Sequence, residues 1–190
     1  MLNKVVDKCL NINLNDNHSH LVFRLTMIQQ HRVQDILNQW ESYTLEADGY
    51  YHRQELKKAG KGFCRTVDLL EPWLDKDHKE LQRVMRLFVL SCHNAAHVLA
   101  KQGKHKEAEY YYSHAHFRLL SLLGQGSKGQ YSKKSMLLDA VLMELRCTFR
   151  QLRSYLVCKN KIELAAGVKE ESVRVIRQQY CDYVEDIFRA

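Results

Sequence analysis

Two histidines four residues apart, His93 and His97, are the residues of this chain whose types and spacing best suit chemistry. Residues four apart lie on one face of an α-helix, and a helix offers two imidazoles to a metal such as zinc in this way. Glu41 or Asp48 would have to supply a third ligand from another helix, because no glutamate follows His93 as it does in the HExxH motif. A metal-binding protein or metal-dependent enzyme is therefore one alternative. The favoured interpretation is a pair that hydrogen-bonds a polar peptide.

The sequence contains no other pattern typical of catalysis. It has no GxSxG, no phosphate-binding Walker loop and no glycine-rich dinucleotide turn. The six cysteines are widely spread and form no CxxC pair, which favours free thiols in a reducing compartment. We therefore expect a protein that is not an enzyme and that needs no cofactor.

Composition and charge narrow the class of partner. The formal net charge of +7 favours an acidic partner only weakly, because no run of five like charges occurs. We expect a protein or peptide partner and do not expect nucleic acid, and a homo-oligomer stays open. No apolar run approaches the ~20 residues that cross a bilayer, and the N-terminus lacks the apolar core and cleavage site of a signal peptide. These absences predict a cytoplasmic protein without a membrane partner.

The elements that would position these residues are helices. One proline and 8 glycines leave few helix breakers, and from about Val33 apolar residues recur at spacings of three and four. Residues 1–30 are predicted to be a poorly defined extension, and residues 31–190 a single all-α domain. Its first predicted helix begins near Val33. The others cover about 55–70, 78–102, 104–123, a long stretch after a loop at 124–134, then 161–166 and 169–188.

Two segments of this helical region repeat each other with an offset of 49 positions. Small and bulky residues recur in both at the same internal spacings. The matching sets are Tyr43, Ala47, Tyr50, Ala59, Phe63 and Thr66, and Cys92, Ala96, Leu99, Ala108, Tyr112 and Ala115. Small residues let two antiparallel helices approach closely, and bulky residues fill the space between neighbouring pairs. The repeat therefore predicts two similar helical pairs.

This pattern resembles the tetratricopeptide repeat (TPR), and the second copy is the better match. Gly103 stands at the turn, followed by Ala108, whereas the first copy has Gln54 at the turn and Pro72 near the expected closing proline. The resemblance implies TPR-like antiparallel pairs at about 40–73 and 89–122, and a third, divergent pair with capping helices over 132–190. The offset of 49 exceeds the usual spacing of about 34, so a regular superhelix is not expected. The chain is also similar to uncharacterised bacterial TPR-like proteins, which implies no activity.

In TPR proteins the first helix of each pair lines a concave groove that holds a peptide. The resemblance places Glu41, Thr44, Asp48, Tyr51 and His52 from the first copy, and His93, Asn94, His97 and Lys101 from the second, in that groove. Asn94 matches a position that holds a peptide's terminal carboxylate in some TPR proteins. Thr44 and Asp48 stand where the other residues of such a clamp are expected, so a carboxylate clamp is not predicted. The resemblance implies an adaptor that binds a polar peptide or partner.

A DNA-binding regulator is a second alternative. Residues 161–178 resemble the turn and second helix of a helix-turn-helix, and a recognition helix there would place Ser172, Arg174 and Arg177 near DNA. Acidic residues within the same segment oppose this interpretation, because they would meet phosphates.

Overall fold

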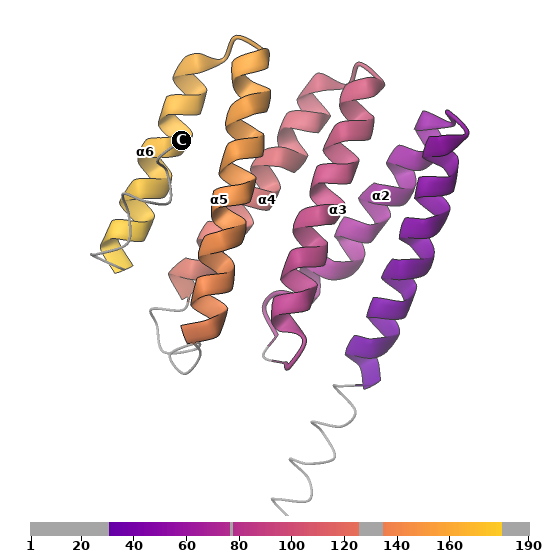
Figure 1. Cartoon of the computed structure of the whole chain (residues 1–190), viewed down its shortest axis with the longest axis horizontal. Helices are drawn as coiled ribbons and strands as arrows, with labels where there is room; N and C mark the ends of the chain where they lie inside the picture. Colours follow the sequence, from indigo (N-terminus) through magenta and orange to yellow (C-terminus); the bar gives the residue numbers. More distant parts are fainter. Residues whose placement is uncertain (1–30, 77, 126–134, 180–190) are drawn as a thin grey trace, which may run out of the picture.

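The structure, a computed structural model, describes residues 31–76, 78–125 and 135–179 (Figure 1). A first helix covers residues 31–52. It is followed by α2 (Leu56–Leu70), the short 3-10 helix η1 (Glu71–Trp73), α3 (Leu81–Lys101), α4 (His105–Gln125), α5 (Ser135–Cys158) and α6 (Ile162–Gln179). No strand occurs in these ranges, so the predicted all-α class is confirmed. The predicted extension at 1–30 lies outside the described residues, as do most of the predicted loop and the last predicted residues.

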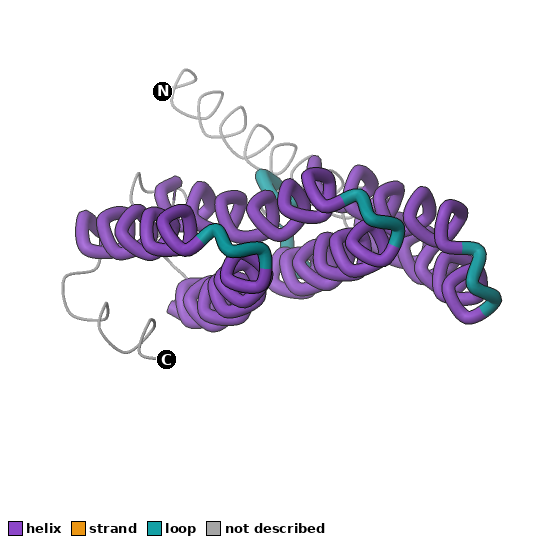
Figure 2. Tube along the Cα trace, turned by 90° about the horizontal axis from the view of Figure 1, so that it is seen from above, coloured by secondary structure: helices purple, strands orange, loops and turns teal. Residues whose placement is uncertain are grey.

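The helices lie side by side in chain order and form antiparallel pairs (Figure 1). We call the first helix with α2 the first pair, α3 with α4 the second pair, and α5 with α6 the third pair. The pairs stack in two layers, with the first helix, α3 and α5 in one layer and α2, α4 and α6 in the other (Figure 2). The first helix of every pair therefore belongs to one face of the molecule.

The turns inside the three pairs share one backbone geometry. Each contains a residue in the left-handed conformation, which we call the turn residue: Gln54 (φ 63°), Gly103 (φ 77°) and Asn160 (φ 57°). In each turn the next N–H donates to a carbonyl oxygen five positions earlier, from Glu55 to Tyr50, Lys104 to Leu99 and Lys161 to Leu156, always over 2.9 Å. This is the Schellman arrangement that ends a helix by using its free carbonyl groups. Gln54 therefore forms the turn that its side chain alone did not predict.

Counting from the turn residue, the third pair repeats the other two. A buried alanine follows each turn residue by five positions, and a fully buried small residue by twelve. These are Ala59, Ala108 and Ala165, and Thr66, Ala115 and Ser172. Asn160 follows Gly103 by 57 positions, so the spacing between the pairs is irregular. The divergent region predicted at the C-terminal end thus contains a third pair built on the same plan.

The last pair corrects one prediction. A short helix at 161–166 with a break before residue 169 is wrong, because α6 is continuous from Ile162 to Gln179. Gly167 lies inside this helix, where glycine costs only about 1 kcal/mol relative to alanine. No turn separates two helices, and Ser172, placed at DNA by the helix-turn-helix interpretation, is fully buried. This segment therefore lacks the geometry of a recognition helix.

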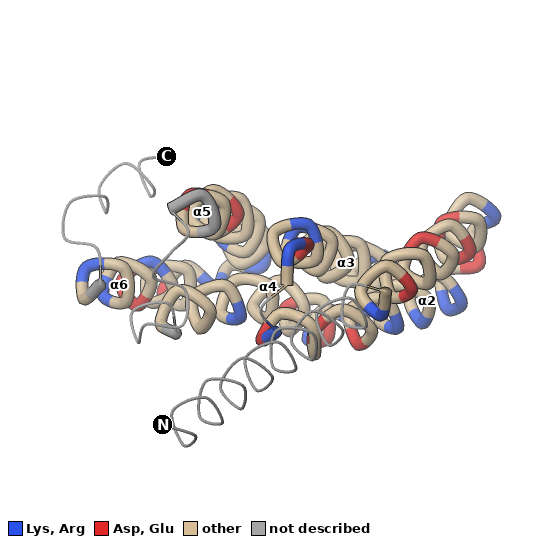
Figure 3. Tube along the Cα trace, turned by 90° about the horizontal axis from the view of Figure 1, so that it is seen from below, with Lys and Arg blue, Asp and Glu red and all other residues tan. Residues whose placement is uncertain are grey.

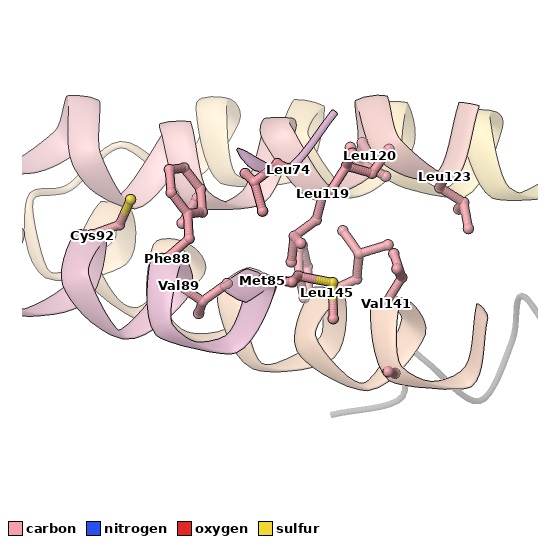
Figure 4. Packing of buried hydrophobic residues seen from close by; sticks show 14 of the residues in the cluster. Leu74, Met85, Phe88, Val89, Cys92, Leu119, Leu120, Leu123, Val141 and Leu145 are labelled. Carbon is pink, nitrogen blue, oxygen red and sulfur yellow. The ribbon is translucent and has the colours of Figure 1, made fainter. Parts of the chain in front are cut away.

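Apolar side chains from all three pairs hold the layers together. Phe88 and Met85 of α3 meet Leu119 of α4 and Leu145 of α5 in one continuous core (Figure 4). A second, smaller cluster closes the first pair around Ala47, Ala59 and Phe63. There the helices approach so closely that a Cβ on Gly62 would lie 2.6 Å from the Ala47 Cβ. Small residues therefore set the spacing within this pair, as the repeat predicted.

Replacing Gly103 with alanine is expected to lower the free energy of unfolding by about 1 kcal/mol, because a Cβ disfavours the left-handed conformation. A Cβ at Gly103 would meet no atom within 4 Å, so the backbone is the sole cause. Gln54→Gly, at the equivalent position, should raise the free energy of unfolding by about 0.5 kcal/mol. Chemical denaturation measures both changes, and a shift of the same sign in both variants would contradict the shared turn geometry.

Candidate functional site

The first helix and α3 bring three of the predicted groove residues together. The Tyr51 hydroxyl oxygen lies 3.2 Å from His97 Nε2, and Lys101 Nζ donates a hydrogen bond to the same hydroxyl. Tyr51 is half-buried, whereas His97 and Lys101 are exposed. We call these three residues the cross-helix cluster. It joins two segments that are about 50 positions apart in the sequence.

The hydrogen bonds of the cross-helix cluster determine what it offers to a ligand. An ammonium group can only donate, so the Tyr51 oxygen accepts from Lys101. When the hydroxyl donates its one proton to His97 Nε2, a neutral His97 ring carries its single proton on Nδ1. His97 Nδ1 and the remaining Lys101 protons are donors, so the cluster suits an acceptor such as a backbone carbonyl or a carboxylate.

Trp40, about three helical turns before Tyr51, links the same two helices. The Trp40 indole N–H of the first helix donates to Ser91 Oγ of α3 over 2.9 Å. Ser91 in turn donates to the Leu87 carbonyl oxygen over 2.8 Å. The partly buried Trp40–Ser91 bond joins the two helices on which the cluster depends, and the bond to Leu87 within α3 orients Ser91 for it.

Three further predicted residues lie on the first helix, and one of them, His52, contacts Tyr51 with ring centroids 5.9 Å apart. Asp48 Oδ2 is 3.3 Å from His52 Nε2, one helical turn along, and both side chains are mostly exposed. Glu41 is also exposed. These carboxylates make the first-helix side of the face acidic, and α3 contributes the donors of His97 and Lys101.

His93 and His97 have different surroundings. His97 is exposed and bonded to Tyr51, whereas the His93 ring packs against Tyr112 of α4 with ring centroids 5.7 Å apart. Burial lowers the pKa of His93 to about 4, so its ring is neutral at physiological pH. Its Nε2 is buried and has no hydrogen-bond partner in the structure.

No metal site is completed around His93 and His97. Across residues 31–76, 78–125 and 135–179, no three His, Cys, Asp or Glu side chains gather in a way that could hold a metal ion. Asp48, the suggested third ligand, bonds His52 instead. The metal alternative therefore lacks the ligand set that it required.

Thr44 and His93 occupy equivalent positions, ten residues before their turn residues. Thr44 Oγ1 is, like His93 Nε2, a buried polar atom without a partner. Such an atom costs about 1–3 kcal/mol when it stays unpaired. Asn94, beside His93, is half-buried. Two successive pairs therefore carry an unsatisfied polar group at the same position of their first helix.

A buried polar network that sequence reasoning missed joins α4, α5 and α6. His116 is fully buried, with Nδ1 3.1 Å from Thr148 Oγ1 and Nε2 2.7 Å from Ser172 Oγ. Burial lowers the pKa of His116 to about 4, which keeps the ring neutral. The sequence offered one signal for this network, which was the presence of the small polar residues Thr148 and Ser172 on helix faces that are otherwise apolar. Because these atoms are inaccessible, the network has a structural role.

Two further predictions were free cysteine thiols and the absence of a membrane-spanning helix. Cys64, Cys92, Cys147 and Cys158 are free thiols. Cys9 and Cys181 lie outside the described residues. Within those residues, no helix has the length and apolar character required to cross a membrane.

These observations define the class of the protein, which is an all-α protein of stacked antiparallel helical pairs with a polar cluster between the first helices of two neighbouring pairs. The chain belongs to the family described as "Protein of unknown function (DUF2753)", whose model matches residues 38–183. The match covers all three helical pairs almost completely. Comparisons with curated proteins and with solved structures found no match.

Proposed function

We propose that the protein is a non-enzymatic scaffold of three TPR-like pairs that binds a polar segment of a partner protein across the face of the first helix and α3. The observation that carries this proposal is the cross-helix cluster, because Tyr51 of the first pair holds His97 and Lys101 of the second pair in place as hydrogen-bond donors on one face. The equivalent surface in TPR proteins is where a peptide binds.

The proposed segment is polar rather than a hydrophobic helix. Glu41, Asp48, His97 and Lys101 are exposed on the proposed face and carry both signs of charge. Figure 3 shows acidic and basic positions on helices of both layers. A mixed surface of this kind favours a partner that matches its charges, because complementary charge gives specificity more than affinity.

Selection from a random peptide library against the whole protein tests the proposal. Selected peptides should bind the variant with both Tyr51→Phe and Lys101→Ala about tenfold more weakly, since a charge-assisted hydrogen bond contributes about 1.5–3 kcal/mol. Lys106→Ala removes an exposed lysine from α4 in the other layer and should leave binding unchanged. Peptides that bind the double variant as tightly as the native protein would contradict the proposed site.

A further inference from the structure

One face of α5 carries three arginines that no acidic side chain neutralises among residues 31–76, 78–125 and 135–179. Arg146, Arg150 and Arg153 are spaced by four and three residues, so they lie on one side of the helix. All three are exposed, and between Leu145 and Cys158 the helix contains no acidic residue. We call these residues the α5 arginines. Like charges at this spacing repel one another and destabilise the helix slightly.

Several other arginines of the protein have acidic partners. Arg118 of α4 bonds Asp75 over 2.6 Å, and Arg174 of α6 bonds Glu171 over 2.6 Å. Arg86 of α3 reaches Glu144 of α5 over 3.5 Å. The α5 arginines make no ion pair within the part of the chain that the structure describes. Their charges are therefore available to a partner.

The α5 arginines lie in the same layer as the proposed peptide site. Arg150 precedes its turn residue by ten positions, as Thr44 and His93 do. Arg153 precedes it by seven positions, where the first two pairs have the buried alanines Ala47 and Ala96. An exposed charged side chain thus replaces the small residue that closes the other pairs.

Two adjoining hollows surround Arg153. One of about 360 Å³ runs along α5 and is lined by Arg150, Arg153 and Val157, among others. The other, of about 230 Å³, lies between α5 and α6, with Val157 and Ile162 in its wall and Arg153 and Lys169 beside them. Val157 is 47% exposed and Ile162 63% exposed. The surface therefore combines positive charge with uncovered apolar side chains.

We propose that the α5 arginines, with Lys169, Val157 and Ile162, bind an acidic peptide segment that carries apolar side chains between its carboxylates. Arginine binds carboxylates with two parallel hydrogen bonds, and the apolar side chains would cover Val157 and Ile162. This inference rests on the proposed function. It adds that the part of the partner bound at the third pair is acidic.

The charge of the neighbouring helix favours a peptide over nucleic acid. Glu163 and Glu170 of α6 are exposed beside Ile162 and Lys169. They would repel the continuous phosphates of a nucleic-acid strand, whereas a peptide can place its few carboxylates only at the arginines. Exposed aliphatic side chains also offer nothing to a phosphate backbone.

Fluorescence anisotropy with the whole protein tests the inference, with a labelled Glu-Glu-Leu-Glu-Glu-Leu-Glu peptide as the probe. The variant with Arg150→Glu and Arg153→Glu should bind it at least about tenfold more weakly. The variant with Lys57→Glu and Lys61→Glu changes net charge equally on exposed positions of α2, in the other layer, and should bind it within about threefold of the native protein. A peptide with lysine in place of glutamate should bind the arginine variant better than the native protein.

Four outcomes would overturn the inference. They are no binding of the acidic peptide by the native protein, an equal loss in both charge variants, equal binding of a glutamine version of the peptide, and stronger competition by a DNA oligonucleotide of matched charge. The variant with Tyr51→Phe and Lys101→Ala separates the two proposals. If that variant loses none of the library-selected peptides but the arginine variant loses the acidic probe, the α5 site stands and the cross-helix site fails. Circular dichroism of Arg150→Ala with Arg153→Ala, which keeps the helix and removes the charge, controls for folding.

Discussion

Lowering the pH from 6.5 to 4.5 is expected to destabilise the protein strongly, by several kcal/mol in the free energy of unfolding. His93 and His116 are the cause, since burial lowers the pKa of each from 6.5 to about 4. Below pH 6.5 the unfolded chain binds protons at these rings and the folded protein does not, so stability falls until the pH reaches about 4. Each ring contributes about 3 kcal/mol over the full window.

Urea denaturation at a series of pH values measures this dependence, and two variants assign it. His116→Leu leaves the hydroxyls of Thr148 and Ser172 bonded to carbonyl oxygens of their own helices, so no new unpaired group arises. His116→Leu and His93→Phe should each remove about half of the pH dependence. Exposed carboxyls such as Glu55 and Glu171 have lowered pKa values and lose their ion pairs only below about pH 4.5. A native profile that is flat between pH 6.5 and 4.5 would contradict the buried neutral state of both rings.

Replacing Phe88 with alanine should produce the largest loss from a single core residue, about 3–5 kcal/mol in the free energy of unfolding. Phe88 of α3 is fully buried and belongs to the core that joins all three pairs (Figure 4). The loss combines the removed apolar surface with the cavity that the surrounding side chains cannot fill. Thermal and chemical denaturation both measure it.

Phe117→Ala is the matched control for Phe88→Ala. Phe117 lies on α4 and is 43% exposed, so its removal leaves no closed cavity. We expect a loss of about 1 kcal/mol or less. Equal losses in the two variants would show that Phe88 does not occupy the centre of the core.

The helices and the first two pairs could be predicted because their signals are local. An amphipathic helix repeats its apolar residues at spacings of three and four, and Ala47, Ala59, Ala96 and Ala108 mark where two helices meet. All four alanines are fully buried. Sequence spacing alone therefore placed the first helix beside α2 and α3 beside α4.

The third pair was predicted only as a divergent one, because its residue types differ while its backbone repeats that of the other two pairs. Its turn residue is Asn160 instead of glycine, and Arg153 replaces the alanine of the other pairs. Gly and Asn favour the left-handed turn, whereas Gln54 adopts it without such a preference, so packing selects that conformation in the first pair. Gly167 led to the opposite error. It suggested a break between two helices, whereas packing keeps α6 continuous through it.

The amino-acid sequence by itself determined the all-α class, the positions of most helices and the candidate residues Tyr51, His97 and Lys101. Only the tertiary structure decided which of them touch, that His93 is half-buried with its Nε2 atom enclosed while His97 is exposed, and that the α5 arginines have no acidic partner among the described residues. The physical reason is the separation along the chain between the residues that determine each feature. Helix formation depends on residues within one or two turns, whereas hydrogen bonds, burial and charge pairing depend on residues about 50 positions away, brought close by stacking of the pairs.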